Sequence, residues 1–154
     1  MAGAASIVRM QPQTPLIREA TIDDAAQIWP LAEALATSYR PTRTAFTEIL
    51  GRITADPQAT VLVATDGERI IGYVHVLTHE AFHADGAIGW VEELMVAPER
   101  RDSGAGRALM EAAESWARDR SDIAYLAVAT RRAQGFYSSI GYEDSATYFK
   151  KQFR

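Results

Sequence analysis

The sequence predicts one α/β domain with a mixed sheet and about four helices, and three observations lead there. Its 154 residues suit a single core. Strand-like runs alternate with amphipathic helical runs along the chain, without repeats. A strand-helix-strand crossover over 88–129 requires two parallel strands inside an otherwise antiparallel or mixed sheet. The expected order is β-α-α-β-β-β-α-β-α-β.

The domain is expected to cover residues 16–154. Residues 1–15 contain Pro and Gln and no long apolar core, so they are predicted to be a flexible N-terminal leader. LIREA (16–20) is predicted to be the first strand. Apolar residues at helical spacing then predict two helices, over roughly 24–38 and 43–54. Pro30 lies inside the first of them and predicts a kink or a late start.

A hairpin is expected next. TVLVAT (60–65) and RIIGYVHVLT (69–78) flank an Asp-Gly turn. The segment 79–86 is predicted to be a polar connection. IGWVEELMVA (88–97) is the following strand, and Pro98 stops it.

The clearest helix spans 103–120, where small and apolar residues share one face. IAYLAVA (123–129) carries no charge, as expected for a strand buried on both faces. A helix follows over about 131–139, with Thr130 as its cap. Residues 146–153 alternate sufficiently to predict a final edge strand.

Composition excludes several classes of function. There are no cysteines, which excludes disulfides, thiolate zinc sites and a cysteine nucleophile, and which fits a cytoplasmic protein. The net charge of −4 comes from interspersed acidic and basic residues, so no nucleic-acid-binding face is expected. No stretch is long and apolar enough to predict a membrane span.

The segment VAPERRDSGAGRALM (96–110) joins a strand to a helix through Gly104 and Gly106. Glycines let a backbone approach a ligand closely, and the N–H groups of a first helical turn favour anions. Neighbouring arginines add positive charge. The segment therefore suits a pyrophosphate, although a glycine-rich helix entry with solvated arginines is the alternative.

Two blocks of the sequence resemble the GNAT superfamily, the acyl-CoA-dependent N-acyltransferases. Residues 101–106, RDSGAG, match [R/Q]-x-x-G-x-[G/A] after a strand that ends in L-x-V-x-P. Downstream, residues 133–142 match A-x-x-F-Y-x-x-x-G-[F/Y]. Both blocks occur in the family's order, and the predicted elements fit its fold from residue 16 onward. The family's common asparagine is replaced by Thr130, which puts one cofactor-side contact in doubt.

The resemblance implies an N-acetyltransferase that uses acetyl-CoA as co-substrate and no metal, by direct attack of a primary amine in a ternary complex. Main-chain groups of the glycine loop would hold the pyrophosphate, and one strand would pair with the pantetheine arm in a gap between 88–97 and 123–129. The implied cofactor-binding residues are Leu94, Met95, Val96, Arg101, Asp102, Ser103, Gly104, Ala105, Gly106, Arg107, Thr130 and Tyr137.

Glu92 and Glu93 are the candidate catalytic bases. A charge within an apolar strand is costly unless it has a partner or a task. Alternation predicts that the two side chains point to opposite faces of the sheet. We prefer Glu92 because related enzymes often place an acid there, and Glu93 is the second choice. The alternative is that one glutamate pairs with an arginine and the other meets solvent.

Tyr137 matches the tyrosine that often serves as general acid in this family. Its ordinary pKa of about 10 lies above that of a thiol, so it can protonate the departing thiolate. The alternative is that it only packs its ring and hydrogen-bonds the cofactor sulfur.

The acceptor is expected to be an amine of a small molecule or a protein, bound between the first two helices, the connection at Tyr39 and Arg40, and the 79–86 loop. Its identity is not readable from the sequence. The rival hypothesis is a catalytically idle acyl-CoA-binding module. A homodimer is compatible with the resemblance, because dimers are common among such enzymes.

The stretch HEAFH (79–83) matches the zinc-protease signature H-E-x-x-H. That motif needs a helix, whereas here a strand precedes it and Asp85-Gly86 follows. We therefore expect no zinc site, and keep His79, Phe82 and His83 as candidate acceptor-site residues.

Overall fold

The structure is a computed structural model that describes residues 14–120 and 122–153. Five strands form one sheet in the order β1-β2-β3-β4-β5. They are β1 (Leu16–Glu19), β2 (Ala59–Asp66), β3 (Arg69–Ala81), β4 (Gly86–Val96) and β5 (Ile123–Val128). The first four pair antiparallel, and β5 joins β4 in parallel. The predicted mixed sheet with one parallel crossover is therefore confirmed.

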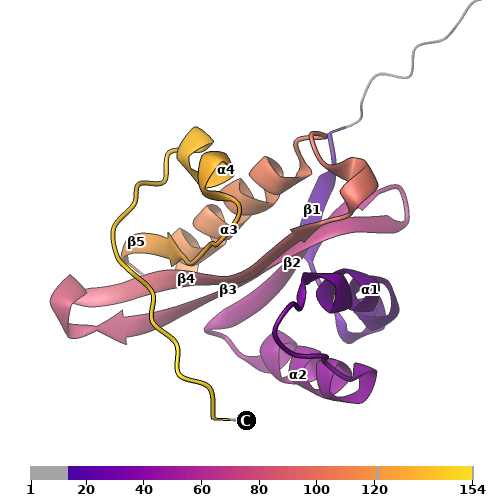
Figure 1. Cartoon of the computed structure of the whole chain (residues 1–154), viewed down its shortest axis with the longest axis horizontal. Helices are drawn as coiled ribbons and strands as arrows, with labels where there is room; N and C mark the ends of the chain where they lie inside the picture. Colours follow the sequence, from indigo (N-terminus) through magenta and orange to yellow (C-terminus); the bar gives the residue numbers. More distant parts are fainter. Residues whose placement is uncertain (1–13, 121, 154) are drawn as a thin grey trace, which may run out of the picture.

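Helices cover both faces of the sheet (Figure 1). One face carries α1 (Ala25–Leu35) and α2 (Arg43–Ala55); the other carries α3 (Ala105–Arg120) and α4 (Gln134–Ser139). Three short 3-10 turns, η1 (Ile22–Asp24), η2 (Phe82–Ala84) and η3 (Pro98–Arg100), complete the described elements. Figure 1 also shows the C-terminal tail leaving α4 and running past the sheet toward the α1/α2 side.

Each face has its own apolar core because each is covered by a different pair of helices. The α3 core is centred on Leu109 and Met110, which are fully buried against Val74 and Val91 of the sheet. The α1/α2 core joins Ile28, Leu31 and Leu50 to other sheet residues, among them Val63, Tyr73 and Met95. Burial of apolar area on this scale is the main favourable term in folding.

The start of α1 is fixed by a charged contact. Thr21 donates its N–H to Asp24 at 2.8 Å, and Arg18 of β1 donates both guanidinium nitrogens to the same carboxylate at 2.8 Å. The helix then runs through Pro30 and ends at Leu35, so the expected late start is not observed. Ile28 and Leu31 on either side of Pro30 are buried, and their packing offsets the hydrogen bond that proline cannot make.

Three predictions about elements are wrong. Half of the 79–86 connection is strand, since β3 continues to Ala81 and β4 begins at Gly86, and the turn between them is η2. The final strand over 146–153 is not formed, because this segment finds no partner strand among the described residues. β5 is not buried on both faces: it is the edge of the sheet, and Tyr125 remains 43% exposed.

Within the described residues, no helix has the length and apolar character needed to cross a membrane.

Candidate functional site

The edge of β4 opens halfway along the strand. Its parallel pairing with β5 ends at Val91 opposite Val128, yet β4 continues to Val96. Residues 93–96 pair with β3 on one side only. Their other side is an open strand edge, which an extended ligand can join through main-chain hydrogen bonds. Leu94, Met95 and Val96, predicted to hold the pantetheine arm, all lie on this open half.

The glycine loop lies at the end of that edge, between β4 and α3. Gly104 has φ of +85° and Asp102 has φ of +66°, so the chain turns sharply before the helix. A side chain at Gly104 would meet nothing within 4 Å, which leaves its backbone open to a ligand. The first hydrogen bond of α3 runs from the Ala108 N–H to the Gly104 oxygen at 3.0 Å. The N–H groups of Gly106 and Arg107 therefore precede the helical ladder and are available to an anion.

The remaining loop residues support this geometry in different ways. The Ser103 N–H bonds the Arg100 oxygen at 3.3 Å, and the Ser103 hydroxyl accepts weakly from the Ala105 N–H at 3.4 Å. Arg100 forms an ion pair with Asp66, which anchors the loop to β2. Arg101 is exposed, and Arg107 reaches the Ser139 oxygen at 3.5 Å. The loop thus offers main-chain donors and nearby positive charge.

A β-bulge places both candidate bases on one face of the sheet. His75 lies opposite Glu93 and Val76 lies opposite Val91, so Glu92 is the extra residue of β4. Val91 and Leu94 both contact the α3 core although they are three residues apart. The two glutamates between them leave toward the α1/α2 face. The prediction of opposite faces is wrong, because strict alternation does not hold across a bulge.

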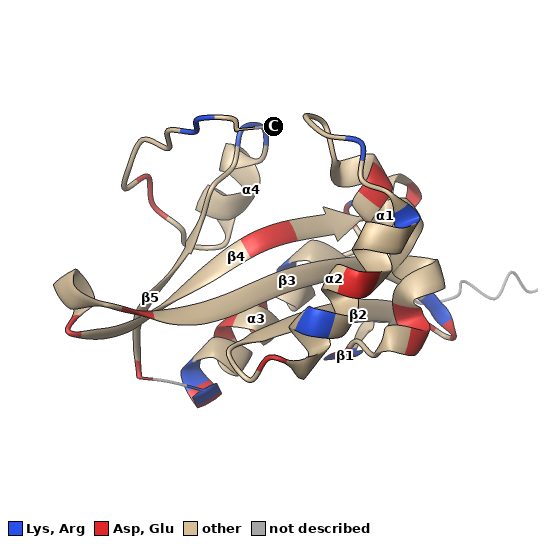
Figure 2. Cartoon of the chain, turned by 90° about the horizontal axis from the view of Figure 1, so that it is seen from below, with Lys and Arg blue, Asp and Glu red and all other residues tan. Residues whose placement is uncertain are grey.

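Each glutamate has one neutral donor. The indole Nε1 of Trp90 donates to Glu92 at 3.0 Å, and the Tyr73 hydroxyl donates to Glu93 at 2.6 Å. Burial and the charge of Glu93 hold the pKa of Tyr73 well above its usual range, so this hydroxyl stays a donor. Neither glutamate forms an ion pair with an arginine in the described part of the chain. Both carboxylates are exposed, and Figure 2 shows this acidic segment of β4 between α1 and the tail.

Tyr137 lies on the opposite face, in the α3 core. Its ring packs edge-on against Phe136 and Tyr142, and burial raises its pKa. Its hydroxyl makes no hydrogen bond to any described residue. Phe136 also approaches the glycine loop, since a side chain at Gly106 would lie 3.3 Å from its ring. The predicted general acid is therefore protonated, and its hydroxyl has no hydrogen-bond partner among the described residues.

Thr130 holds a turn before α4. Its hydroxyl accepts from the Ala133 N–H at 3.0 Å, whereas α4 itself begins at Gln134. The predicted capping bond exists, but one turn earlier than the helix.

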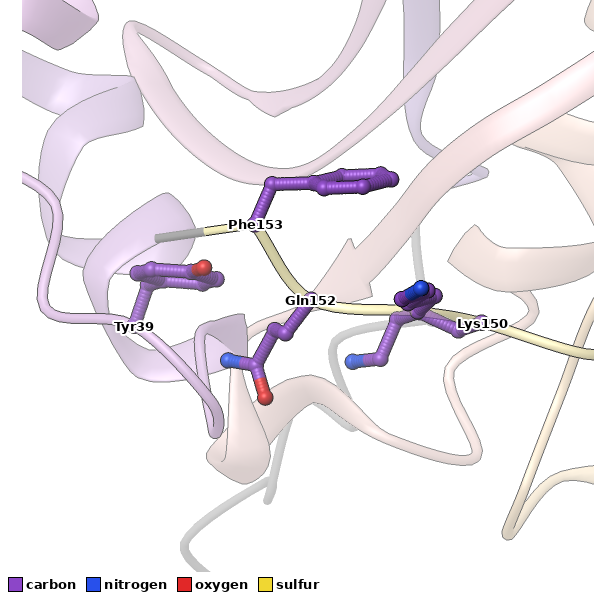
Figure 3. A pocket seen from close by; sticks show the side chains of 5 residues that line it. Tyr39, Lys150, Gln152 and Phe153 are labelled. Carbon is purple, nitrogen blue, oxygen red and sulfur yellow. The ribbon is translucent and has the colours of Figure 1, made fainter.

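A hollow of about 320 Å³ lies between the α1–α2 connection and the C-terminal tail. It is lined by Tyr39, Lys150, Lys151, Gln152 and Phe153, and Figure 3 shows the Tyr39 ring facing the tail. A second, smaller hollow adjoins Tyr39 and Arg40. The sequence predicted that the connection at Tyr39 and Arg40 belongs to the acceptor site. It did not predict a contribution from the tail, because residues 146–153 were expected to form an edge strand of the sheet.

The HEAFH segment does not form a helix. His79 is in β3, while Phe82 and His83 are in η2 at the far end of the hairpin. His83 contacts the Tyr125 hydroxyl at 2.7 Å, and Phe82 is fully exposed. Among the described residues, no group of three His, Asp or Glu side chains is arranged to hold a metal ion.

Coenzyme A fits the residues present. The open edge of β4 leads to the glycine loop, whose backbone has positive φ at Asp102 and Gly104. The space beside Gly104 is empty of protein atoms, so a ligand can approach the backbone there. Main-chain donors at a helix start suit a pyrophosphate. When bound, the acetyl thioester supplies an activated acyl carbonyl.

Comparisons with known proteins agree with this geometry. A family model described as an acetyltransferase (GNAT) domain matches residues 57–144, more than half of the chain. A search of curated proteins by sequence finds no significant match.

Solved structures show the same fold at low sequence identity. Glucosamine-6-phosphate N-acetyltransferase from Arabidopsis thaliana superposes with a TM-score of 0.79 at 18% identity, covering 92% of this chain and 100% of that one. A GNAT family acetyltransferase from Staphylococcus aureus gives 0.76 at 17% identity, with 92% and 100% covered. Aminoglycoside 6'-N-acetyltransferase AAC(6')-IG from Acinetobacter haemolyticus gives 0.73 at 19% identity, with 90% and 99% covered.

Proposed function

The chain belongs to the GNAT acetyltransferase family, and from that premise we propose that it transfers an acetyl group from acetyl-CoA to a primary amine in a ternary complex. The observation that carries the proposal is the open edge of β4. It joins the glycine loop at one end and bears Glu92 and Glu93 in its bulge. A cofactor site and a pair of carboxylates thus share one strand.

The chain's own residues suit the successive steps. Main-chain N–H groups of the loop bind the pyrophosphate, and residues 94–96 align the pantetheine arm. The amide N–H at Leu94 or Met95 is the proposed donor to the thioester oxygen. The bulge directs the Glu92 side chain toward the α1/α2 face. There Glu92 takes a proton from the attacking amine directly or through water. Tyr137 donates its proton to the departing sulfur.

Glu92 is the preferred base because Glu93 accepts the shorter hydrogen bond and is therefore less free to accept a proton. The Tyr73 hydroxyl holds Glu93 at 2.6 Å, whereas Trp90 holds Glu92 at 3.0 Å. We expect Glu92→Gln to lower turnover more than Glu93→Gln, and neither to weaken acetyl-CoA binding. Equal losses would assign the proton transfer to the pair.

The acceptor is proposed to bind on the α1/α2 side, toward the hollow at Tyr39. Lys150 and Lys151, the only lysines of the chain, line that hollow and form no ion pair with a described residue. An acceptor with an anionic group away from its amine would find a partner there. The screen therefore includes amino sugars with and without phosphate, aminoglycosides, polyamines, amino acids and peptides.

The test is thiol release from acetyl-CoA in the presence of each amine. Because the chain has no cysteines, every thiol detected comes from coenzyme A. Amine-dependent release with a mass gain of one acetyl group on the acceptor supports the proposal. Stabilisation by acetyl-CoA without turnover on any amine would favour the idle binding module. Sedimentation of the same preparation tests whether the protein forms a homodimer.

A further inference from the structure

His75 lies in the middle of β3 and faces the two candidate bases. Its neighbours Val74 and Val76 both belong to the α3 core, so the imidazole points to the other face, together with Tyr73. In the pairing of β3 with β4, His75 lies directly opposite Glu93, next to the bulge at Glu92. The residue is half-buried. An imidazole and two carboxylates therefore gather on the face that is proposed to receive the amine.

Two charged residues, Glu92 and Glu93, lie near His75. On β2 its partner is the apolar Val61, and α1 and α2 bring apolar residues such as Ile28 and Leu50 to this face. Tyr73 is neutral and donates to Glu93. Burial lowers the pKa of His75, while Glu93 and Glu92 partly oppose that shift. The imidazole is therefore mostly neutral at pH 7, and the cation it forms on protonation lies beside two carboxylates.

The acceptor amine has to lose two protons. A primary amine with an ordinary pKa near 10 is an ammonium ion at pH 7, so one proton leaves before attack and the other leaves as the amide forms. Glu92 accounts for one transfer. Glu93 already accepts from Tyr73, which favours a supporting role for it.

We infer that His75 is a second catalytic proton acceptor, which takes the first proton from the bound ammonium group, while Glu92 takes the second. This inference rests on the proposed transferase function. Glu93, held by Tyr73, stabilises the imidazolium that results. The lowered basicity of a buried imidazole suits this task, because the proton is then returned readily to solvent.

The ammonium group gives one proton to His75, and the neutral nitrogen forms a bond to the acyl carbon. The carbon–sulfur bond breaks, and its electron pair stays on sulfur. Glu92 takes the second proton from nitrogen, and Tyr137 gives its own to the thiolate. The products are the amide, the free thiol of coenzyme A and one proton released to solvent after the three side chains return to their starting forms.

The test is the pH dependence of kcat/KM for the acceptor in the wild type and in His75→Gln. In the wild type, kcat/KM rises through the His75 pKa, below about 6.5, and then stays level up to the pKa of the amine. In His75→Gln it is expected to fall about 100-fold at pH 7 and to rise steadily up to the amine pKa. The deficit therefore shrinks at high pH. Glu80→Gln removes an exposed titratable side chain from the same strand and is expected to keep the wild-type profile shape.

Acetyl-CoA affinity and the melting temperature show whether His75→Gln is folded. If it is not, His75→Ala with added imidazole replaces it, and partial rescue of the rate supports the inference. A His75→Gln protein that keeps both the rate and the acidic limb overturns the inference while the transferase function stands. A wild type that acetylates no amine and binds no acetyl-CoA is a failure of the proposed function itself.

A measurement without turnover tests the same coupling. The three histidine ring signals are followed by NMR titration, and His75→Gln identifies the signal of His75. The charges of Glu92 and Glu93 raise the pKa of His75. The pKa of His75 is therefore expected to be lower in Glu92→Gln and in Glu93→Gln than in the wild type. A His75 pKa that moves in neither variant overturns the inference.

Discussion

The proposed cofactor side and the proposed acceptor side of this protein are built from different parts of the chain. The cofactor side is one continuous stretch, in which the end of β4, the glycine loop and the start of α3 offer main-chain groups. The acceptor side combines side chains from β3, β4, the α1–α2 connection and the tail. Binding of an invariant cofactor needs only backbone geometry, whereas recognition of a particular amine needs side chains.

This difference predicts how each side responds to substitution. On the cofactor side, a change matters when it obstructs the backbone or alters its φ. On the acceptor side, a change matters when it removes a charge, a proton acceptor or a hydrogen bond. Single substitutions can therefore distinguish the two sides.

Gly104→Val tests the main-chain character of the cofactor side. At φ of +85° a β-branched residue is strained, and its side chain projects into the space left open for the ligand. We expect acetyl-CoA affinity to fall by at least about 100-fold, or about 2.7 kcal/mol, measured by calorimetry. Gly67→Val is the matched control, because Gly67 has φ of +60° and open space at the β2–β3 turn. Equal losses of affinity in both variants would show that strain alone, and not the loop, decides binding.

Tyr137→Phe tests a side chain that contributes chemistry without holding the cofactor. Since burial keeps the hydroxyl protonated, its loss is expected to lower kcat about 10- to 100-fold with acetyl-CoA affinity nearly unchanged. Tyr142→Phe removes a neighbouring hydroxyl that donates to Glu114 at 3.0 Å, so it should affect stability but not turnover. Unchanged kcat in Tyr137→Phe would leave Tyr137 only a packing role.

Asp24→Asn tests the contact that anchors α1, and with it the acceptor side. Arg18 holds the pKa of Asp24 below its ordinary value, so the carboxylate contributes stability above about pH 4 and loses it as the pH falls through the folded-state pKa. At pH 7 the free energy of unfolding is expected to fall by about 1–2 kcal/mol, by urea titration. The difference in stability between the two proteins should disappear once the pH lies below the folded-state pKa of Asp24. Asp23→Asn changes an exposed neighbour and is expected to change stability little at any pH. A difference for Asp24→Asn that does not shrink as the pH falls would contradict the charge argument.

Phe153→Ser and Phe149→Ser compare two exposed aromatic residues of the tail. They are 90% and 88% exposed, so each should change the free energy of unfolding by less than about 0.5 kcal/mol. Only Phe153 lines the hollow at Tyr39, so only Phe153→Ser should raise the acceptor KM, by about threefold, or about 0.6 kcal/mol. Identical KM values for the two variants would place the acceptor away from the tail.

Local patterns in the sequence predicted the mixed sheet, the crossover, the helices and the glycine loop between β4 and α3. Hydrophobic spacing reports which face of an element is buried, and the glycines of residues 101–106 report where the backbone has to turn. Both signals are carried by residues close together in the chain, so no tertiary information is needed to use them. The acid role proposed for Tyr137 was predicted in the same way, from a motif within residues 133–142.

Only the tertiary structure decided the features that depend on pairing between distant segments. The bulge at Glu92 arises from the register of β3 against β4, and it brings both glutamates and His75 to one face. The open edge of β4 beyond Val91 exists because the pairing with β5 ends at Val128. The described part of the C-terminal tail pairs with no strand of the sheet. Strand register is a property of two segments at once, so alternation within one of them could not reveal it.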